Sequence, residues 1–184
     1  MSSRPPAGRI FIIAEIGGAV GKRIHEIQKR FDPKLARSAP PHVTIAGSSG
    51  IGPVHAGTSA AKIRTALAAV AAETQPMELR FSAPHRFMQS NIIVLPLDPH
   101  GPLRELHDAI ARSGLHFSPA RFTFTPHATL SFYPELAPEA IRALLSERID
   151  EPVLIDRLQV YRTMDPQPSV KLLELELQAV GGRR

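Results

Sequence analysis

The chain has 184 residues, of which 43% are hydrophobic and 21% charged, and its net charge is +5. These values are typical of a globular protein with a sizeable core, and the absence of cysteine excludes disulfides, thiolate metal sites and cysteine nucleophiles. The basic balance favours partners that carry phosphate. The apolar run at 10–16 is too short to span a membrane and lacks a signal-peptide cleavage site, so we expect a cytoplasmic protein.

The first quarter of the chain predicts a strand, a helix and a second strand. A short β-branched run at 9–16 ends at two glycines and predicts a buried strand, and apolar residues spaced three and four apart over 19–30 predict a helix. Two prolines within 31–40 predict an irregular connection that leads into an extended segment at 41–45. The small residues of 46–53 predict a loop, either a plain flexible one or one whose N–H groups hold a phosphate.

The rest of the chain alternates helices with strands. Three further helices are predicted, at 58–73, 102–114 and 138–148. The alternating segments 77–81 and 91–97 predict a hairpin or an edge pair with a bulge, and 153–164 with 170–180 predict an antiparallel pair. This order predicts an α+β fold with antiparallel sheet rather than a doubly wound parallel sheet. We expect one domain over residues 1–184, and a monomer.

One motif occurs twice in the chain. The pattern Pro-His-x-Thr-aliphatic lies at 41–45 and again at 126–130, where the histidine comes 85 residues later (127 − 42). Side chains two apart on a strand share a face at a separation of about 7 Å. Each histidine therefore shares a polar face with its threonine, as His42 with Thr44, while the intervening residues face the core. Two such matches favour a single catalytic site over two unrelated strands.

The paired motifs, His42-Val-Thr44-Ile and His127-Ala-Thr129-Leu, resemble those of the two-histidine (2H) phosphoesterase superfamily. Within it they are similar to the LigT-like branch, which comprises 2′-5′ RNA ligases and RNA 2′,3′-cyclic phosphodiesterases. The likeness spans most of the chain. It implies two pseudo-symmetric lobes of antiparallel β-sheet backed by helices around a central cleft, with one motif in each lobe.

Opening a 2′,3′-cyclic phosphate requires one group to take a proton from water and another to give a proton to the departing oxygen. Histidine suits both roles, because its ordinary pKa near ~6.5 allows one copy to be neutral and another protonated. Thr44 and Thr129 can donate hydrogen bonds to the non-bridging oxygens. Spacing does not reveal which histidine is the base. The resemblance implies that His127 activates water and His42 protonates the leaving 3′ oxygen, which leaves a 2′-phosphate.

No metal or other cofactor is expected, because the chain has no carboxylate cluster and no His-x-His or His-Glu-x-x-His motif. The candidates for stacking on a nucleobase are Phe87, Phe132 and Tyr133, each of which can instead pack in the core. Some related enzymes carry an arginine just after the second motif, where this chain has Ser131 and Phe132. The candidate phosphate-binding substitutes are Arg121, Arg86 and Arg162.

Three functions remain open at this stage. The first is a phosphodiesterase that acts on RNA ends or nucleotides with 2′,3′-cyclic phosphates, together with reversible 2′-5′ RNA ligase activity. The second is a non-catalytic module that binds RNA or nucleotides. The third is a 2H enzyme for another cyclic nucleotide, such as a cyclic dinucleotide. The six histidines without a threonine two residues later are expected to be surface or structural groups, with His55 and His85 the nearest to loops that border the site.

Overall fold

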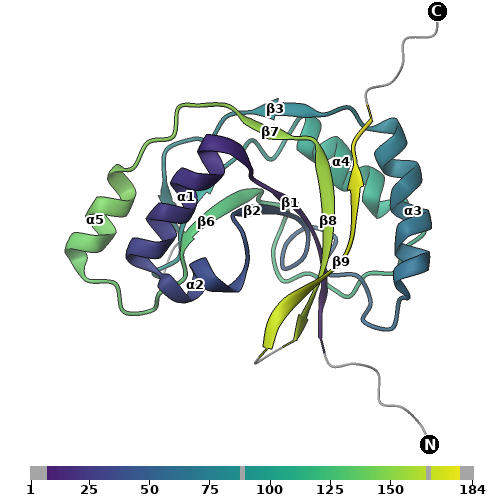
Figure 1. The fold of residues 1–184 in the computed structure, drawn as a ribbon, viewed down its shortest axis with the longest axis horizontal. Coiled ribbons are helices and arrows are strands. Elements are labelled where there is room, and N and C mark those ends of the chain that lie inside the picture. The colour runs from purple at the N-terminus through teal and green to yellow at the C-terminus, as the bar shows by residue number, and fades with distance from the viewer. Residues whose placement is uncertain (1–7, 88–89, 165–166, 179–184) are drawn as a thin grey trace, which may run out of the picture.

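A computed structural model describes residues 8–87, 90–164 and 167–178 and has an α+β fold (Figure 1). A seven-stranded sheet has the order β4-β5-β6-β2-β1-β8-β9, and β3 pairs with β7 in a second, two-stranded sheet. The paired strands are antiparallel, which confirms the predicted fold class. The strands are β1 Ile10–Glu15, β2 His42–Ala46, β3 Met77–Leu79, β4 His85–Arg86, β5 Ile93–Pro96, β6 His127–Ser131, β7 Val153–Ile155, β8 Arg157–Met164 and β9 Gln167–Glu176.

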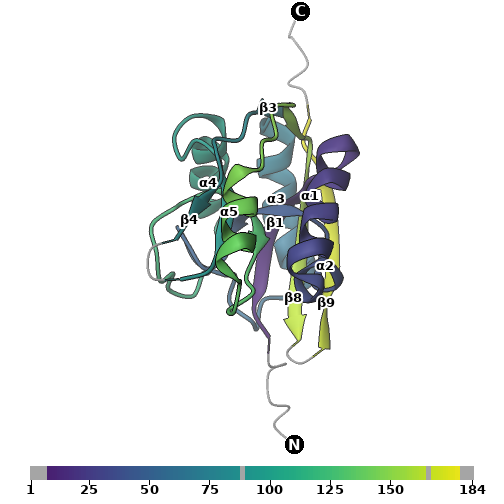
Figure 2. The same ribbon diagram turned by 90° about the vertical axis from the view of Figure 1, so that its left-hand side faces the viewer.

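The helices lie toward the two ends of the large sheet. They are α1 Gly18–Phe31, α2 Pro33–Ser38, α3 Ala60–Glu73, α4 Pro102–Ala111 and α5 Pro138–Ser146. Figure 1 shows the sheet bent into an arch, with α1, α2 and α5 toward one end and α3 and α4 toward the other. Turned by 90°, the molecule shows β8 and β9 side by side along one edge (Figure 2). The helices predicted at 58–73, 102–114 and 138–148 are confirmed.

The two motif strands, β2 and β6, are the central pair of the sheet. They run antiparallel with Val43 opposite Ala128, and β1 and β5 flank them on either side. In both strands the residues after the histidine alternate as the sequence predicts: Val43, Ile45, Ala128 and Leu130 are fully buried, and the histidines and threonines are half-buried. The core therefore fixes which face of the central pair carries the polar side chains.

The irregular connection predicted at 31–40 is wrong, because α2 occupies most of it. Asp32 caps this helix with a side-chain oxygen that accepts from the Leu35 N–H at 3.0 Å, and Pro33 stands at the first helical position. An acidic cap followed by proline is a helix start signal, because proline lacks only an N–H that the first turn leaves unpaired.

The hairpin predicted between 77–81 and 91–97 is also wrong. β3 pairs with β7, and β5 pairs with β6 and with the short β4. Alternation of apolar and polar residues identifies a strand but not its partner, which depends on contacts far along the chain. The predicted pair of 153–164 with 170–180 is confirmed for β8 and β9, although the first segment divides at Asp156. Residues 179–180 of that prediction lie outside the described residues, as do residues 165–166 between its two segments.

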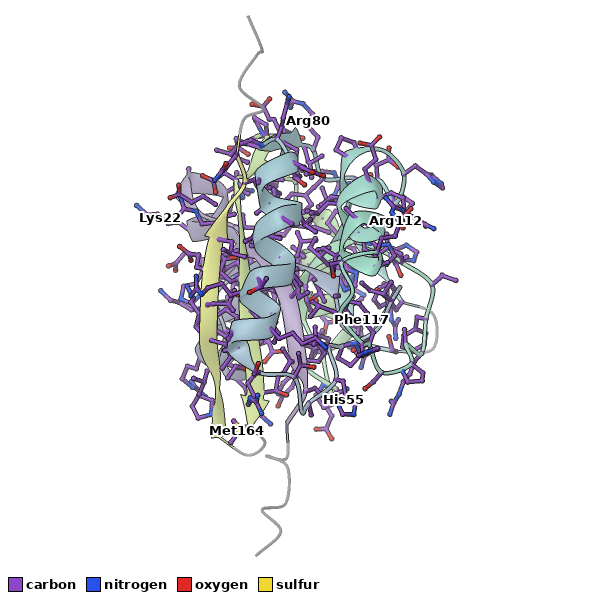
Figure 3. The ribbon with its side chains drawn as sticks, turned by 90° about the vertical axis from the view of Figure 1, so that its right-hand side faces the viewer. Lys22, His55, Arg80, Arg112, Phe117 and Met164 are labelled. Atoms are coloured by element: carbon purple, nitrogen blue, oxygen red, sulfur yellow. The ribbon has the colours of Figure 1, made fainter. Side chains whose placement is uncertain are left out.

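The helical face over α3 and α4 is shown in Figure 3. Contacts of α3 with β9 and of α4 with β2 link these helices to the sheet. Ile63, Leu67, Leu103, Leu106 and Ile110 supply fully buried side chains from the two helices. Within the described residues, none of the helices combines the length and apolarity needed to cross a bilayer.

Candidate functional site

Four polar side chains of the two motifs share one face of the central strand pair. Because Val43 lies opposite Ala128 in an antiparallel register, His42 is level with Thr129 and Thr44 is level with His127. The two histidines are thus diagonal neighbours, a relation that spans roughly 7–8 Å between the strands. The structure therefore brings the four predicted motif residues together.

Both imidazoles are oriented by the main chain in the same way. His42 Nδ1 lies 2.8 Å from the Pro40 carbonyl oxygen, and His127 Nδ1 lies 2.6 Å from the Thr125 carbonyl oxygen. A carbonyl oxygen only accepts, so Nδ1 carries the proton in each ring. Nε2 is then the nitrogen available to a substrate, as an acceptor when the ring is neutral and a donor when it is protonated.

The proline before each histidine ties its motif to the neighbouring strand. The Pro41 carbonyl accepts from the Ile16 N–H at 2.8 Å, just past the end of β1, and the Pro126 carbonyl accepts from the Leu97 N–H at 2.9 Å, just past the end of β5. These two bonds hold the chain extended at the entrance of each motif strand. The repeat seen in the sequence is therefore also a repeat of main-chain geometry.

Burial lowers the pKa of both histidines below the ordinary value of 6.5. The hydrogen bonds to Pro40 and Thr125 oppose this effect, because a carbonyl stabilises the protonated ring. The charges beside the two rings differ: Glu15 raises the pKa of His42, whereas a charge on His42 lowers the pKa of His127. The neighbouring charges thus act in opposite directions on the two rings, while burial lowers the pKa of both.

Glu15 belongs to a network on the motif face that the sequence analysis missed. It lies opposite His42 in the register of β1 and β2, and its carboxylate accepts from the Tyr161 hydroxyl at 2.6 Å and pairs with Lys171 at 3.0 Å. Burial, followed by Glu15, raises the pKa of Tyr161 to about 12, which keeps that hydroxyl a donor. The Glu15 N–H also donates to Gln159 at 2.9 Å. The signal was available, because a carboxylate ends the strand that precedes the first motif.

The end of the second motif strand is held by two buried polar side chains from the α1–α2 region. Gln28 donates to the Thr129 carbonyl at 2.8 Å, and Asp32 accepts from the Phe132 N–H at 2.8 Å. Both side chains are buried. Asp32 thus joins the start of α2 to the end of β6, and the missed helix is part of what positions the site.

The predicted stacking residues lie around the second motif. The Phe87 ring meets the His127 ring edge-on, with centroids 5.2 Å apart at 85°. Phe132 and Tyr133 are 52% and 45% exposed, which rules out core packing for both. Phe132 lines a pocket of about 380 Å³ together with Arg86 and Asn91. Phe87 is therefore in a position from which a base near His127 can be contacted, whereas Phe132 lies beyond the far end of β6.

The three arginines named from the sequence have different surroundings. Arg86 donates to the Ser90 carbonyl and to Asn91, each at 2.7 Å, beside the Phe132 pocket. Arg121 lines another pocket, next to the loop that follows β2. Tyr161 is on the motif face, where it bonds to Glu15. Arg162 is the next residue of the same strand and lies opposite Ile10, so its side chain points to the other face of the sheet. The suggestion that Arg162 binds phosphate is therefore wrong.

The other histidines serve the fold or the surface. His107 is buried, stacks on Phe124 at 4.2 Å, and accepts from the Ile51 N–H through Nε2 while Nδ1 bonds to Asp108. His55 is exposed and lies near Phe117 at the lower end of the helical face in Figure 3. His85 is exposed beside Phe87, with ring centroids 6.2 Å apart. Over the described ranges, no group of three or more His, Cys, Asp or Glu residues is arranged to hold a metal ion.

Several solved structures have the same fold as this chain. The chain matches Escherichia coli LigT in its apo form with a TM-score of 0.61 and 18% identity, over 94% of this chain and 98% of that chain. It matches the LigT complex with 3′-AMP with a TM-score of 0.59 and 17% identity over the same shares. A further crystal structure, described as a phosphoesterase, gives 0.52 at 17% identity over 94% of this chain and 99% of that one. At these identities the matches establish the fold.

A search of curated proteins gives no significant match. The family model of the 2′-5′ RNA ligase superfamily, by contrast, matches residues 17–167, which include both histidine motifs. Because this match covers most of the chain and the fold is that of LigT, the chain belongs to the 2′-5′ RNA ligase superfamily of two-histidine phosphoesterases.

Proposed function

We propose that this protein is a metal-independent phosphodiesterase that opens 2′,3′-cyclic phosphates at RNA ends or on nucleotides and leaves a 2′-phosphate. The observation that carries the proposal is the pair of histidines on one face, each with Nδ1 bonded to a carbonyl and Nε2 available. Two proton-transfer groups on opposite sides of one phosphorus are what the reaction requires. The whole chain acts as one domain in this proposal.

On the entering side, His127 Nε2 takes a proton from water as the water oxygen bonds to phosphorus. On the leaving side, the bond between phosphorus and O3′ breaks, and His42 Nε2 gives its proton to that oxygen. Glu15 supports this division, because a carboxylate opposite His42 favours the protonated ring. One proton is gained and one lost at the histidines in each turnover, and exchange with water restores both.

Thr44 and Thr129 are proposed to donate to the non-bridging oxygens, where negative charge gathers as phosphorus becomes five-coordinate. Each threonine is level with the histidine of the opposite strand. Hydrogen bonds from both strands then hold the phosphate at the seam between them. A 5′-hydroxyl that takes the place of water would give a 2′-5′ linkage, the ligase activity.

The base of the terminal nucleoside is proposed to lie by Phe87 and Phe132. Phe87 contacts the His127 ring, and Phe132 is exposed at the end of the same strand. Aromatic stacking accepts any base, because every base has a π-face. This arrangement predicts little preference for one base over another.

The test is hydrolysis of oligoribonucleotides that end in a 2′,3′-cyclic phosphate, assayed after treatment with a chelator. Phosphorus NMR of the product identifies which oxygen leaves. We expect turnover without added metal and a 2′-phosphate product. Salt-sensitive RNA binding without turnover would instead support a non-catalytic binding module, and turnover confined to cyclic dinucleotides would support another substrate class.

A further inference from the structure

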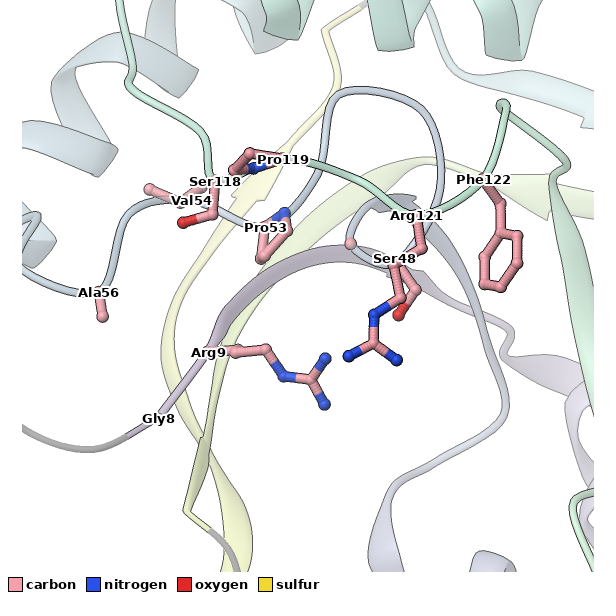
Figure 4. A pocket seen from close by; sticks show the side chains of 11 residues that line it. Gly8, Arg9, Ser48, Pro53, Val54, Ala56, Ser118, Pro119, Arg121 and Phe122 are labelled. Atoms are coloured by element: carbon pink, nitrogen blue, oxygen red, sulfur yellow. The ribbon is translucent and has the colours of Figure 1, made fainter.

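A second basic pocket lies beside the site and has no part in the proton transfers. It has a volume of about 290 Å³ and is lined by Arg9, Ser48, Arg121 and Phe122, among others. Figure 4 shows the guanidinium groups of Arg9 and Arg121 pointing toward one another, with Ser48 alongside. We call this the Arg9–Arg121 pocket.

Local contacts hold the Arg9 side chain and the main chain of Arg121. The Arg9 guanidinium lies over the Phe11 ring at 5.3 Å, and the Arg121 N–H donates to the Ser48 carbonyl at 3.1 Å. Across residues 8–87, 90–164 and 167–178, no carboxylate forms an ion pair with either guanidinium. Two like charges that face each other in this way repel, and an anion between them removes the repulsion.

An aromatic side chain completes the pocket. Phe122 is 66% exposed, the most exposed of the large hydrophobic side chains in the described residues. The Gly50 N–H donates to the Phe122 carbonyl at 2.9 Å, which fixes the main chain beside the loop that follows β2. Cationic groups next to an exposed aromatic ring are the combination that binds single-stranded nucleic acid, through phosphate contacts and base stacking.

The pocket adjoins the catalytic face. Gly47 follows β2 and lines the pocket, and a Cβ atom at Gly47 would lie 2.5 Å from Thr44 Cγ2. Arg121 and Phe122 precede β6 at this same end of the central pair, and Phe132 follows β6 at the opposite end. A short oligonucleotide can therefore run along the strands from one end to the other.

We infer that the Arg9–Arg121 pocket binds the phosphodiester and the base immediately upstream of the terminal nucleoside, with the two guanidiniums on the phosphate and Phe122 against the base. The preferred substrate class is then an oligoribonucleotide with a cyclic phosphate end rather than a cyclic mononucleotide. This inference rests on the proposed function, because it assumes that the cyclic phosphate lies between His42 and His127.

The test compares kcat/KM for cytidine 2′,3′-cyclic phosphate with kcat/KM for a trinucleotide that ends in the same group. We expect the natural protein to prefer the trinucleotide. Arg9→Gln and Arg121→Gln should each lower that preference about tenfold, since each removes a charged contact to phosphate. Phe122→Ala should lower it as well. Arg64→Gln on α3 is the matched control, because it removes an equal charge from an exposed position.

A second readout is direct binding. Dissociation constants for a trinucleotide with a 3′-phosphate, measured over a range of salt concentrations, should show a shallower salt dependence in both arginine variants than in Arg64→Gln. An equal preference in the natural protein and both arginine variants would overturn the inference while turnover persists. If neither the cyclic mononucleotide nor the trinucleotide is turned over, the proposed function itself is refuted.

Discussion

The two motif strands hold their histidines by the same main-chain geometry but place them beside different neighbours. In the register of the sheet, Glu15 lies opposite His42, whereas Pro96 lies opposite His127. The first ring therefore has a carboxylate nearby, and the second has a proline and the edge of Phe87. A duplicated backbone thus presents two equivalent nitrogens, and the adjacent strands give the first ring a carboxylate neighbour that the second lacks.

The largest expected effect comes from removing either ring. His42→Ala and His127→Ala should each lower kcat/KM on a cyclic-phosphate oligonucleotide by about a thousandfold, as expected for loss of a general acid or base. Loss of His127 should abolish the decline in rate at acidic pH, and loss of His42 the decline at alkaline pH. His100→Ala, at an exposed turn, is the control. Rates equal to those of the natural protein in either variant would refute the division of roles.

The threonines test whether both strands hold the phosphate. Thr44→Val and Thr129→Val should each lower kcat by about a hundredfold, because each removes a hydrogen-bond donor that acts on the developing charge. Serine at the same positions keeps the hydroxyl and should retain most of the rate. Steady-state kinetics separate kcat from KM. A loss that appears only in KM would mean that the threonines bind the ground state alone.

The anchoring of the second strand is tested by stability. Asp32→Ala removes the cap of α2 and the acceptor for the Phe132 N–H, and should lower the free energy of unfolding by about 2 kcal/mol. Ser59→Ala removes only the cap of α3, at an exposed site, and should cost less. Urea denaturation gives both values. Equal losses would show that the link between α2 and β6 adds nothing to stability.

The smallest effect concerns the charge beside His42. Burial lowers the pKa of both histidines, so kcat/KM should be greatest below pH 6.5, falling on the alkaline side as the acid loses its proton. Glu15→Gln removes a group that raises the pKa of His42 and should move the alkaline limb to lower pH.

NMR titration of the imidazoles identifies which ring responds to that substitution. His42 should change more than His127 in Glu15→Gln, and neither should change in the control Glu26→Gln, which alters an exposed glutamate on α1. A larger change at His127 would reverse the proposed assignment of acid and base.

The sequence predicts the motif strands well because their alternation matches a sheet with one buried face. Val43, Ile45, Ala128 and Leu130 are buried, and the histidines and threonines that alternate with them are only half-buried. The period of two in the sequence thus appears again in the burial pattern. The helix at 58–73 is predicted equally well, since its apolar stripe and the Ser59 cap agree. Local residue patterns predict a strand or helix well when its conformation does not depend on distant parts of the chain.

Pairing and charge are what the sequence left undecided. That Met77–Leu79 would pair with Val153–Ile155 depends on residues far apart in the chain, and no local pattern specifies it. Glu15 and Arg9 gained their significance in the same way, from the register of β1 against its neighbours and from the loop that carries Arg121. The candidate catalytic histidines could be predicted from a motif. Glu15, which affects the pKa of His42, and Arg9, which lines the neighbouring pocket, could not.

The joint between β2 and β6 has one further consequence. Val43 and Ala128 form the one cross-strand pair of this joint in the described residues, whereas β8 and β9 share a long ladder. His42 lies on β2 and His127 on β6, so each side of this strand pair supplies one imidazole. A small shift of β2 relative to β6 would therefore move the two rings apart without changing any residue of the site. A phosphate bound to side chains of both strands would hold the two halves in register.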